Sequence, residues 1–301
     1  MQKIACDIGY GFTKFKTDKI VASFPSAIAH ARKSQADIAT NLAHEFEGGH
    51  YLIGDAAVRN ALTTRDYSWL AKYAPLLLFE AINQAELSPA NEIKLVTGLS
   101  LLNWSKRNEF AERLSDFVVD KIRVNNIKIT LVPQGKGVYL DCLAKIKDLA
   151  TALCLVVDIG TNTLDVIPFE AGKALASEAY ATSDGMNQVI QEVQKLVNRE
   201  FGISASEAEV TKIIRSNQIS IAGEVRDLSV WIEEEKQIYF EMILNQICSK
   251  NADLFKRADL IIFAGGGANY APDYLPQNKQ FYFIPEPENS NVNGYFTLLS
   301  D

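Results

Sequence analysis

The triplet Asp-Ile-Gly occurs twice in this chain, each time at the end of a short apolar stretch. The first copy, at residues 7–9, follows KIAC, and the second, at residues 158–160, follows LCLVV. After each copy comes a turn of small or polar residues and a second apolar stretch, a pattern typical of a buried strand, a tight turn and a returning strand. The copies lie 151 positions apart (158 minus 7), about half the chain. This repeat predicts two domains of related design with a ligand held between them.

The residue types in these turns suit a phosphate and a magnesium ion. Glycine lets backbone N–H groups come close to a ligand, and a nest of such donors binds phosphate. Asp7 and Asp158 are candidates to order the water shell of Mg²⁺, an ion that keeps several waters and needs few protein ligands. Lys14 is placed to add a cationic contact to a phosphate. A third glycine turn, at residues 265–267, follows another apolar strand and would allow the close backbone approach that adenosine needs.

Length and composition limit the classes of protein to consider. At 301 residues and 33.4 kDa the chain can form two domains, and 48% hydrophobic with 22% charged residues is usual for a soluble globular protein. No apolar run approaches the roughly 20 residues of a membrane span, and there is no basic leader, so we expect a cytoplasmic protein without membrane contact. A net charge of −7 argues against direct nucleic-acid binding. Any connection to DNA would run through a partner protein.

Local patterns outline the domains. We expect domain I over residues 1–150, with a small inserted subdomain at about 25–66, much of it irregular. Domain II would cover 151–301, with an inserted helical subdomain at about 187–256 and a tail at about 285–301 that packs back on domain I. Among the predicted elements are a helix over 69–86, in spite of Pro75, and a helix over 224–250. No helix is assigned to the tail, which carries Pro285 and Pro287.

Several segments together resemble one family. They are, in chain order, DIGYGFTK, FPS, YLIGDAA, VTGLS, PQGKG, DIGTNTLDV, FAGGGA and NVNGY. The chain is similar over nearly its whole length to the actin and chaperone-ATPase superfamily, and within it to the plasmid-segregation actins of the ParM/StbA type and related archaeal actin-like proteins. The resemblance implies an α/β fold with duplicated ribonuclease-H-like domains, each with an inserted subdomain, around a nucleotide cleft. The classical P-loop motif is absent. The glycine triplet does not match the dinucleotide-binding motif GxGxxG either, because Tyr270 occupies the position of the third glycine of that motif.

The resemblance also implies the residues of the site. Those that bind the nucleotide, ATP or ADP, are Gly9, Tyr10, Gly11, Thr13, Lys14, Gly160, Thr161, Asn162, Thr163, Asp165, Gly185, Gly265, Gly266 and Gly267. The acids near the metal, Mg²⁺, are Asp7 and Asp158, acting through water. The residue that orients the attacking water falls on Gln134, although it could instead be a turn residue that caps the next helix. Asp165 could likewise serve only to hold the hairpin turn.

The activity implied is that of a bacterial or archaeal actin-like ATPase. Such a protein polymerises when nucleotide fills the cleft, hydrolyses ATP to ADP and phosphate, and segregates or positions plasmid DNA through a DNA-binding adaptor. One alternative is a phosphotransferase of the sugar-kinase branch, which needs an acid as base near its acceptor hydroxyl, a role that Gln134 cannot fill. Another is a scaffold that binds ATP and barely hydrolyses it.

Overall fold

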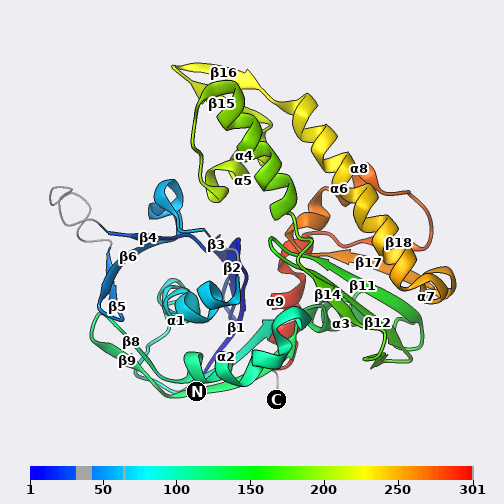
Figure 1. The fold of residues 1–301 in the computed structure, drawn as a ribbon. Helices are drawn as coiled ribbons and strands as arrows, with labels where there is room; N and C mark the ends of the chain where they lie inside the picture. Colours follow the sequence, from blue (N-terminus) through cyan, green and yellow to red (C-terminus); the bar gives the residue numbers. More distant parts are fainter. Residues whose placement is uncertain (32–42, 64–65, 300–301) are drawn as a thin grey trace. The chain divides into compact units, whose positions relative to one another are not determined.

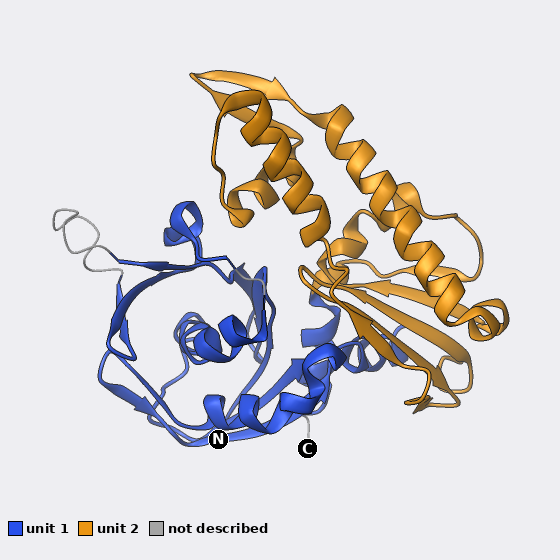
Figure 2. Cartoon of the chain, viewed as in Figure 1, with its two compact units in different colours: residues 1–147, 289–301 blue, residues 148–288 orange. Residues whose placement is uncertain are grey.

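The chain forms two compact units, which Figure 2 shows in different colours. Unit 1 comprises residues 1–147 and 289–301, and unit 2 comprises residues 148–288. The structure, a computed structural model, describes residues 1–31, 43–63 and 66–299. Part of the irregular insertion and the last two residues of the tail lie outside these ranges. No helix within the described ranges has the length and the apolar character that a membrane span requires.

Unit 1 is built on a five-stranded sheet (Figure 1). Its strands, in order of pairing, are β10 (Ile127–Pro133), β7 (Ile93–Leu99), β1 (Gln2–Ile8), β2 (Phe12–Lys16) and β3 (Val21–Pro25). The first three run parallel, and β2 and β3 run antiparallel to their neighbours. Along β1 the side chains alternate between the two faces. Ile4 and Cys6 join the large core that contains helix α1, while Ala5 joins a second core with the C-terminal helix.

The helix predicted over 69–86 is confirmed as α1 (Tyr67–Gln84). The side chain of Asp66 accepts a hydrogen bond from the backbone N–H of Trp69 at 3.0 Å and so caps the first turn. Pro75 lies inside the helix and is buried, and the helix continues past it. The other helices of unit 1 are α2 (Arg107–Ser115), α3 (Lys136–Leu143) and α9 (Ser290–Thr297).

Helix α9 lies in the tail, to which the sequence analysis assigned no element. It lies against α3 and the sheet in very close contact, since a Cβ atom at Gly294 would overlap the carbonyl of Gly137. Next to this contact the ring of Tyr295 is completely buried, and a Cβ atom at Gly98 would overlap its hydroxyl. Gly98, Gly137 and Gly294 therefore permit a close approach of α9 to α3 and the sheet, which a side chain at any of these positions would prevent.

A buried polar contact also joins α9 to α3. The Ser290 hydroxyl donates to the Asp141 carboxylate over 2.8 Å, and Lys145 pairs with the same oxygen at 2.7 Å. We expect Ser290→Ala to lower the free energy of unfolding by about 1–2 kcal/mol, since Asp141 keeps its ion pair and loses one donor. Thermal unfolding should then begin roughly 3–6 °C lower. Ser249→Ala, at an exposed serine on another helix, is the control, and equal midpoints for the two variants would contradict this account.

The inserted part of unit 1 contains more regular structure than expected. Its small sheet pairs β4 (Ile28–His30), β6 (Gly49–Ile53) and β5 (His44–Phe46), in that order. The prediction of an irregular segment was thus wrong at both of its described ends. A separate hairpin, β8 (Phe117–Val119) and β9 (Ile122–Val124), follows α2.

Unit 2 repeats the arrangement of the first sheet. The strands pair in the order β13 (Lys173–Ala174), β12 (Leu164–Glu170), β11 (Leu153–Ile159), β17 (Leu260–Ala264) and β18 (Phe281–Phe283), and β14 (Tyr180–Thr182) also pairs with β12. As in unit 1, a central strand pairs with an antiparallel hairpin partner on one side and a parallel strand on the other. The two predicted hairpins are confirmed.

The inserted part of unit 2 combines helices with a hairpin. Its elements are α4 (Asn187–Phe201), α5 (Glu207–Ser216), β15 (Gln218–Ile221), β16 (Glu224–Asp227), α6 (Ser229–Lys250) and α7 (Ala252–Arg257), and α8 (Ala271–Tyr274) follows β17. The helix predicted over 224–250 therefore begins later, because its first residues pair with β15. Gly223 and Ala222, both with positive φ, form the turn between the two strands.

Candidate functional site

The first Asp-Ile-Gly turn places a carboxylate between two donors. Asp7 is 3% exposed near the end of β1, and its register partner on β2 is Lys14. The Lys14 ammonium lies 3.2 Å from Asp7 Oδ2. The turn itself is tight, since Gly9 N–H donates to the Phe12 carbonyl at 3.2 Å and a Cβ atom at Gly9 would come within 2.9 Å of that oxygen. Asp7, Gly9 and Lys14 are thus brought together.

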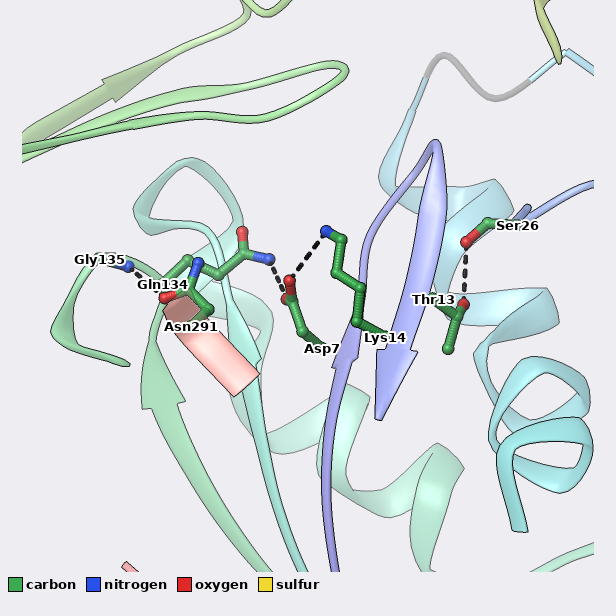
Figure 3. A network of polar contacts seen from close by, with 7 residues as sticks. All are labelled: Asp7, Thr13, Lys14, Ser26, Gln134, Gly135 and Asn291. Carbon is green, nitrogen blue, oxygen red and sulfur yellow. Dashed lines mark hydrogen bonds and ion pairs between the residues drawn. The ribbon is translucent and has the colours of Figure 1, made fainter. Parts of the chain in front are cut away.

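Gln134 reaches the same carboxylate from 127 positions away. It follows β10, whose carboxyl end lies at the same sheet edge as that of β1. Its side-chain Nε2 donates to Asp7 Oδ1 at 2.9 Å, and Figure 3 shows the amide oxygen turned away from Asp7. Because the N–H group is engaged, the oxygen is the atom left to accept a hydrogen bond from water.

The C-terminal helix supports the turn that carries Gln134. The N–H of Gly135, a residue with φ of 81°, donates to Asn291 Oδ1 at 3.0 Å. Asn291 lies in the first turn of α9, and Figure 3 shows it beside Gln134. The backbone of this turn is therefore held by a residue from the far end of the sequence.

Two residues predicted to bind nucleotide point elsewhere. The Thr13 and Ser26 hydroxyls form a buried hydrogen bond of 2.9 Å, which Figure 3 shows apart from Asp7 and Lys14. The Tyr10 ring lies 6.4 Å from that of Trp69, and its hydroxyl accepts from Asn103 at 3.4 Å. Burial raises the pKa of Tyr10 to about 12. Gly11 accepts a hydrogen bond from Ser26 N–H. These contacts shape the loop, and the side chains of Thr13 and Tyr10 are not brought to Asp7.

The second Asp-Ile-Gly turn carries two carboxylates. Asp158 on β11 stands directly opposite Asp165 on β12, and both are buried, at 5% and 1% exposure. Opposite residues of an antiparallel pair have Cβ atoms about 5 Å apart on the same face. Two carboxylates this close repel each other when both are charged, and a bound cation or a shared proton relieves that repulsion. In unit 1 the corresponding pair is Asp7 and Lys14, so the two related turns differ in charge.

The start of α4 packs on this second turn. Gly160 N–H donates to the Thr163 carbonyl at 2.9 Å, and the turn residues Asn162 and Thr163 are buried. At the start of α4, the N–H groups of Met186 and Asn187 donate to the carbonyls of Gly160 and Thr161, at 3.0 and 2.7 Å. Gly185 precedes them, and a Cβ atom there would overlap the Thr161 carbonyl. This close contact with Thr161 therefore requires a glycine at position 185.

The glycine triplet after β17 meets the same turn. Gly265 has φ of 82°, and a Cβ atom on it would overlap Asp158 and the Ile159 carbonyl. A Cβ atom on Gly267 would overlap Ile159. At Gly266, by contrast, a Cβ atom would meet nothing within 4 Å among the described residues. The predicted residues of unit 2 therefore come together at one end of β11 and β17, where two glycines are packed and one faces open space.

One residue near the glycine triplet, Lys236, was not predicted from the sequence. Lys236 on α6 is 4% exposed, with its ammonium 4.5 Å from the centre of the Tyr270 ring and 3.3 Å from Glu233 Oε1. Tyr274 donates a hydrogen bond to Glu233, which is the main cause of a lowered pKa for that carboxyl. Tyr270 N–H in turn donates to the Gly267 carbonyl. A Glu-x-x-Lys pair whose lysine lies on the apolar side of a helix was the available signal.

Comparison with known proteins relates the two halves of the chain to known domains. Residues 5–137 match the N-terminal domain of actin-like proteins, and residues 156–277 match the C-terminal domain of the archaeal actin homologue described as MreB-like. A search of curated protein sequences found no match.

Solved structures resemble the chain over nearly its full length. A non-polymerisable quadruple mutant of pCBH ParM is 21% identical, covers 99% of this chain and 98% of its own, and has a TM-score of 0.80. The archaeal actin homologue Ta0583 is 18% identical, with 99% coverage of both chains and a TM-score of 0.81. A 15-stranded ParM filament from Clostridium botulinum is 20% identical, covers 99% and 98%, and has a TM-score of 0.78. The predicted two-domain fold is confirmed.

Proposed function

Because the chain belongs to the actin-like proteins, we propose that it is an ATPase that polymerises into filaments when it binds ATP and Mg²⁺. Hydrolysis of the ATP to ADP and phosphate then makes the filaments fall apart. The observation that carries the proposal is the convergence of Lys14 and Gln134 on Asp7. A lysine, an acid and an amide are a set suited to phosphate, metal-bound water and attacking water.

The residues present fit a nucleotide and a hydrated magnesium ion. Asp158 and Asp165 place two carboxylates opposite each other on β11 and β12, and the open space at Gly266 leaves room for a ligand on the glycine triplet. Asp7 and Asp158 would hold Mg²⁺ through its water shell. When bound, the ion supplies neutralisation of the phosphate charge. Lys14 would bind a phosphate oxygen, and the backbone N–H groups of the two Asp-Ile-Gly turns would bind the others.

Known structures of relatives support the two parts of this proposal. Ta0583 has been solved in complex with ADP, and ParM from Clostridium botulinum as a 15-stranded filament. We further propose that the filament segregates or positions plasmid DNA in the cytoplasm, through a DNA-binding adaptor protein. A chain of net charge −7 is poorly suited to hold DNA by itself.

Sedimentation tests the proposal. The protein should pellet with ATP and Mg²⁺ at tens of micromolar and stay in the supernatant without nucleotide. Protein that stays in the supernatant across salts and nucleotides would show that it does not form filaments. A small acceptor that stimulates turnover without pelleting would instead favour a phosphotransferase.

Gln134 allows a separate test of the hydrolytic step. We expect Gln134→Ala to slow phosphate release by on the order of a hundredfold, because the attacking water loses its acceptor, the amide oxygen. Assembly should persist, since the phosphate loops are intact, and the filaments should last longer. Gln84→Ala, at an exposed glutamine in the last turn of α1, is the control. Hydrolysis by Gln134→Ala at the wild-type rate would disprove the role given to Gln134.

A further inference from the structure

Exposed apolar side chains gather on one part of unit 2. Val225 on β16 and Val230, Trp231 and Ile238 on α6 are 63%, 76%, 42% and 57% exposed. They fall within fourteen residues, whereas the other exposed large apolar side chains among the described residues are spread over unit 1. We call these four residues, together with the exposed acids Glu234 and Glu241 of α6, the α6 outer face. Figure 1 shows the elements that carry it, β16 running directly into α6.

The arrangement of α6 explains why these side chains cannot join the core. Its inner side carries buried residues, among them Ile232, Phe240 and Ile243. At 100° per residue, Trp231 and Ile238 fall within about 20° of each other on the opposite side. Val230 is adjacent to Trp231 in the first turn of the helix, and Val225 lies on β16, three positions before Leu228, which connects the strand to α6. This apolar surface therefore stays in water unless another molecule covers it.

The α6 outer face is also acidic. Glu234 and Glu241 are exposed on the same side of the helix as Ile238. Next to them the pKa of Glu235 is raised, chiefly by burial and then by the negative charges of Glu192 and Glu234. A partner that covers this face therefore gains from carrying positive charge as well as apolar surface.

Unit 1 carries exposed apolar and cationic side chains together, with the Asp66 carboxylate near Lys106. Leu102 is 47% exposed at the start of the turn that leads into α2, and Lys106 and Arg107 follow it, both exposed. The Lys106 ammonium lies 4.4 Å from the centre of the Tyr67 ring, and the Arg107 guanidinium lies 5.7 Å from that of Trp104. These stacked cations are held in place beside an apolar side chain. We call Leu102, Lys106 and Arg107 the basic face.

We propose that the α6 outer face of one copy of this chain binds the basic face of a second copy. The inference rests on the proposed function, because it names the contact by which the copies join. Two different surfaces are used, so each copy keeps one free surface of each kind. A contact between two different surfaces extends into an open filament when its rotation does not close into a ring.

Two charge-reversed variants test this pairing. Glu234→Lys/Glu241→Lys and Lys106→Glu/Arg107→Glu should each raise the protein concentration needed for light scattering with ATP and Mg²⁺ about tenfold or more, because like charges then meet. An equal mixture should assemble near the wild-type concentration, since each reversed face finds its complement on the other variant. Two variants that assemble alone as well as the wild type, or a mixture that gains nothing over either alone, would overturn the pairing.

The apolar part of the face is tested by Val230→Glu/Ile238→Glu, which changes only exposed residues. It should raise the threshold concentration about tenfold or more as well, with unchanged nucleotide binding and unfolding midpoint. Val118→Glu, at a valine 47% exposed on β8, is the matched control. If the wild type assembles and this double variant does so equally well, the surface is wrong and the proposed function stands. If the wild type itself never assembles, the proposed function is wrong, and the pairing of the two faces that rests on it is wrong as well.

Discussion

We expect the Asp158→Ala variant to release phosphate from ATP with Mg²⁺ at least about a hundredfold more slowly than the wild type. Asp158 is buried opposite Asp165, so the two carboxylates form the most concentrated negative charge of the second turn. Removing Asp158 takes away one of the two carboxylates, Asp7 and Asp158, that the proposal assigns to the water shell of the ion. Phosphate release over a range of Mg²⁺ concentrations measures the effect.

Two further variants separate charge from shape at this position. Asp158→Asn keeps the size of the side chain and should lose activity to a similar degree, because the charge is what the ion requires. Asp253→Ala removes an acid from exposed α7 in the same unit and should behave as the wild type. If Asp158→Ala hydrolyses ATP normally at low Mg²⁺ while the unfolding midpoint is unchanged, Asp158 is not needed near the metal.

The second large effect is expected at Gly265. Its φ of 82° is strained for any residue with a side chain, and a Cβ atom would overlap both Asp158 and the Ile159 carbonyl. We expect Gly265→Ala to destabilise unit 2 by about 3 kcal/mol or more, which corresponds to a midpoint roughly 6–12 °C lower. Nucleotide binding should also be lost, since the strained loop would push Asp158 aside. Thermal unfolding without nucleotide and a titration with ATP give the two readouts.

The neighbouring glycine provides the control for this experiment. A Cβ atom at Gly266 meets nothing within 4 Å among the described residues, so Gly266→Ala should leave the unfolding midpoint unchanged. If adenosine packs on this loop, the added methyl group should still weaken nucleotide binding. Equal midpoints for the Gly265 and Gly266 variants would contradict the packing described here, and unchanged binding by Gly266→Ala would remove the loop from the proposed site.

The parts of the fold that depend on local signals were predictable. An apolar run ending in Asp-Ile-Gly and a returning apolar run specify a hairpin within about fifteen residues. Both hairpins are present, as β1–β2 and β11–β12. Their duplication also indicated two related sheets. The approach of Gln134 to Asp7 joins residues 127 positions apart. No local pattern reports such a contact, and the resemblance alone pointed to it.

The differences between the predictions and the structure also have physical causes. Helix α9 contains Gly294, which lowers helix propensity, yet the close contact with Gly137 requires a glycine there. Tertiary packing thus outweighs the low helix propensity of glycine, which is the only signal that the local sequence offers at this position. The residues Glu224–Asp227 lack a helix start signal, but it is their pairing with β15 that excludes them from α6. The resemblance implies that Thr13 binds nucleotide, and this remains a prediction. Alternation along β2 turns its side chain to the other face, toward Ser26.

The central claim is that nucleotide hydrolysis is coupled to filament assembly, and one measurement tests it most directly. Phosphate release is followed together with light scattering over a range of protein concentrations, with ATP and Mg²⁺ in excess. Our account predicts that both signals rise together above one threshold concentration and stay low beneath it. Phosphate release that is simply proportional to protein concentration, with scattering that stays flat, would contradict it and identify an ordinary ATPase or kinase site.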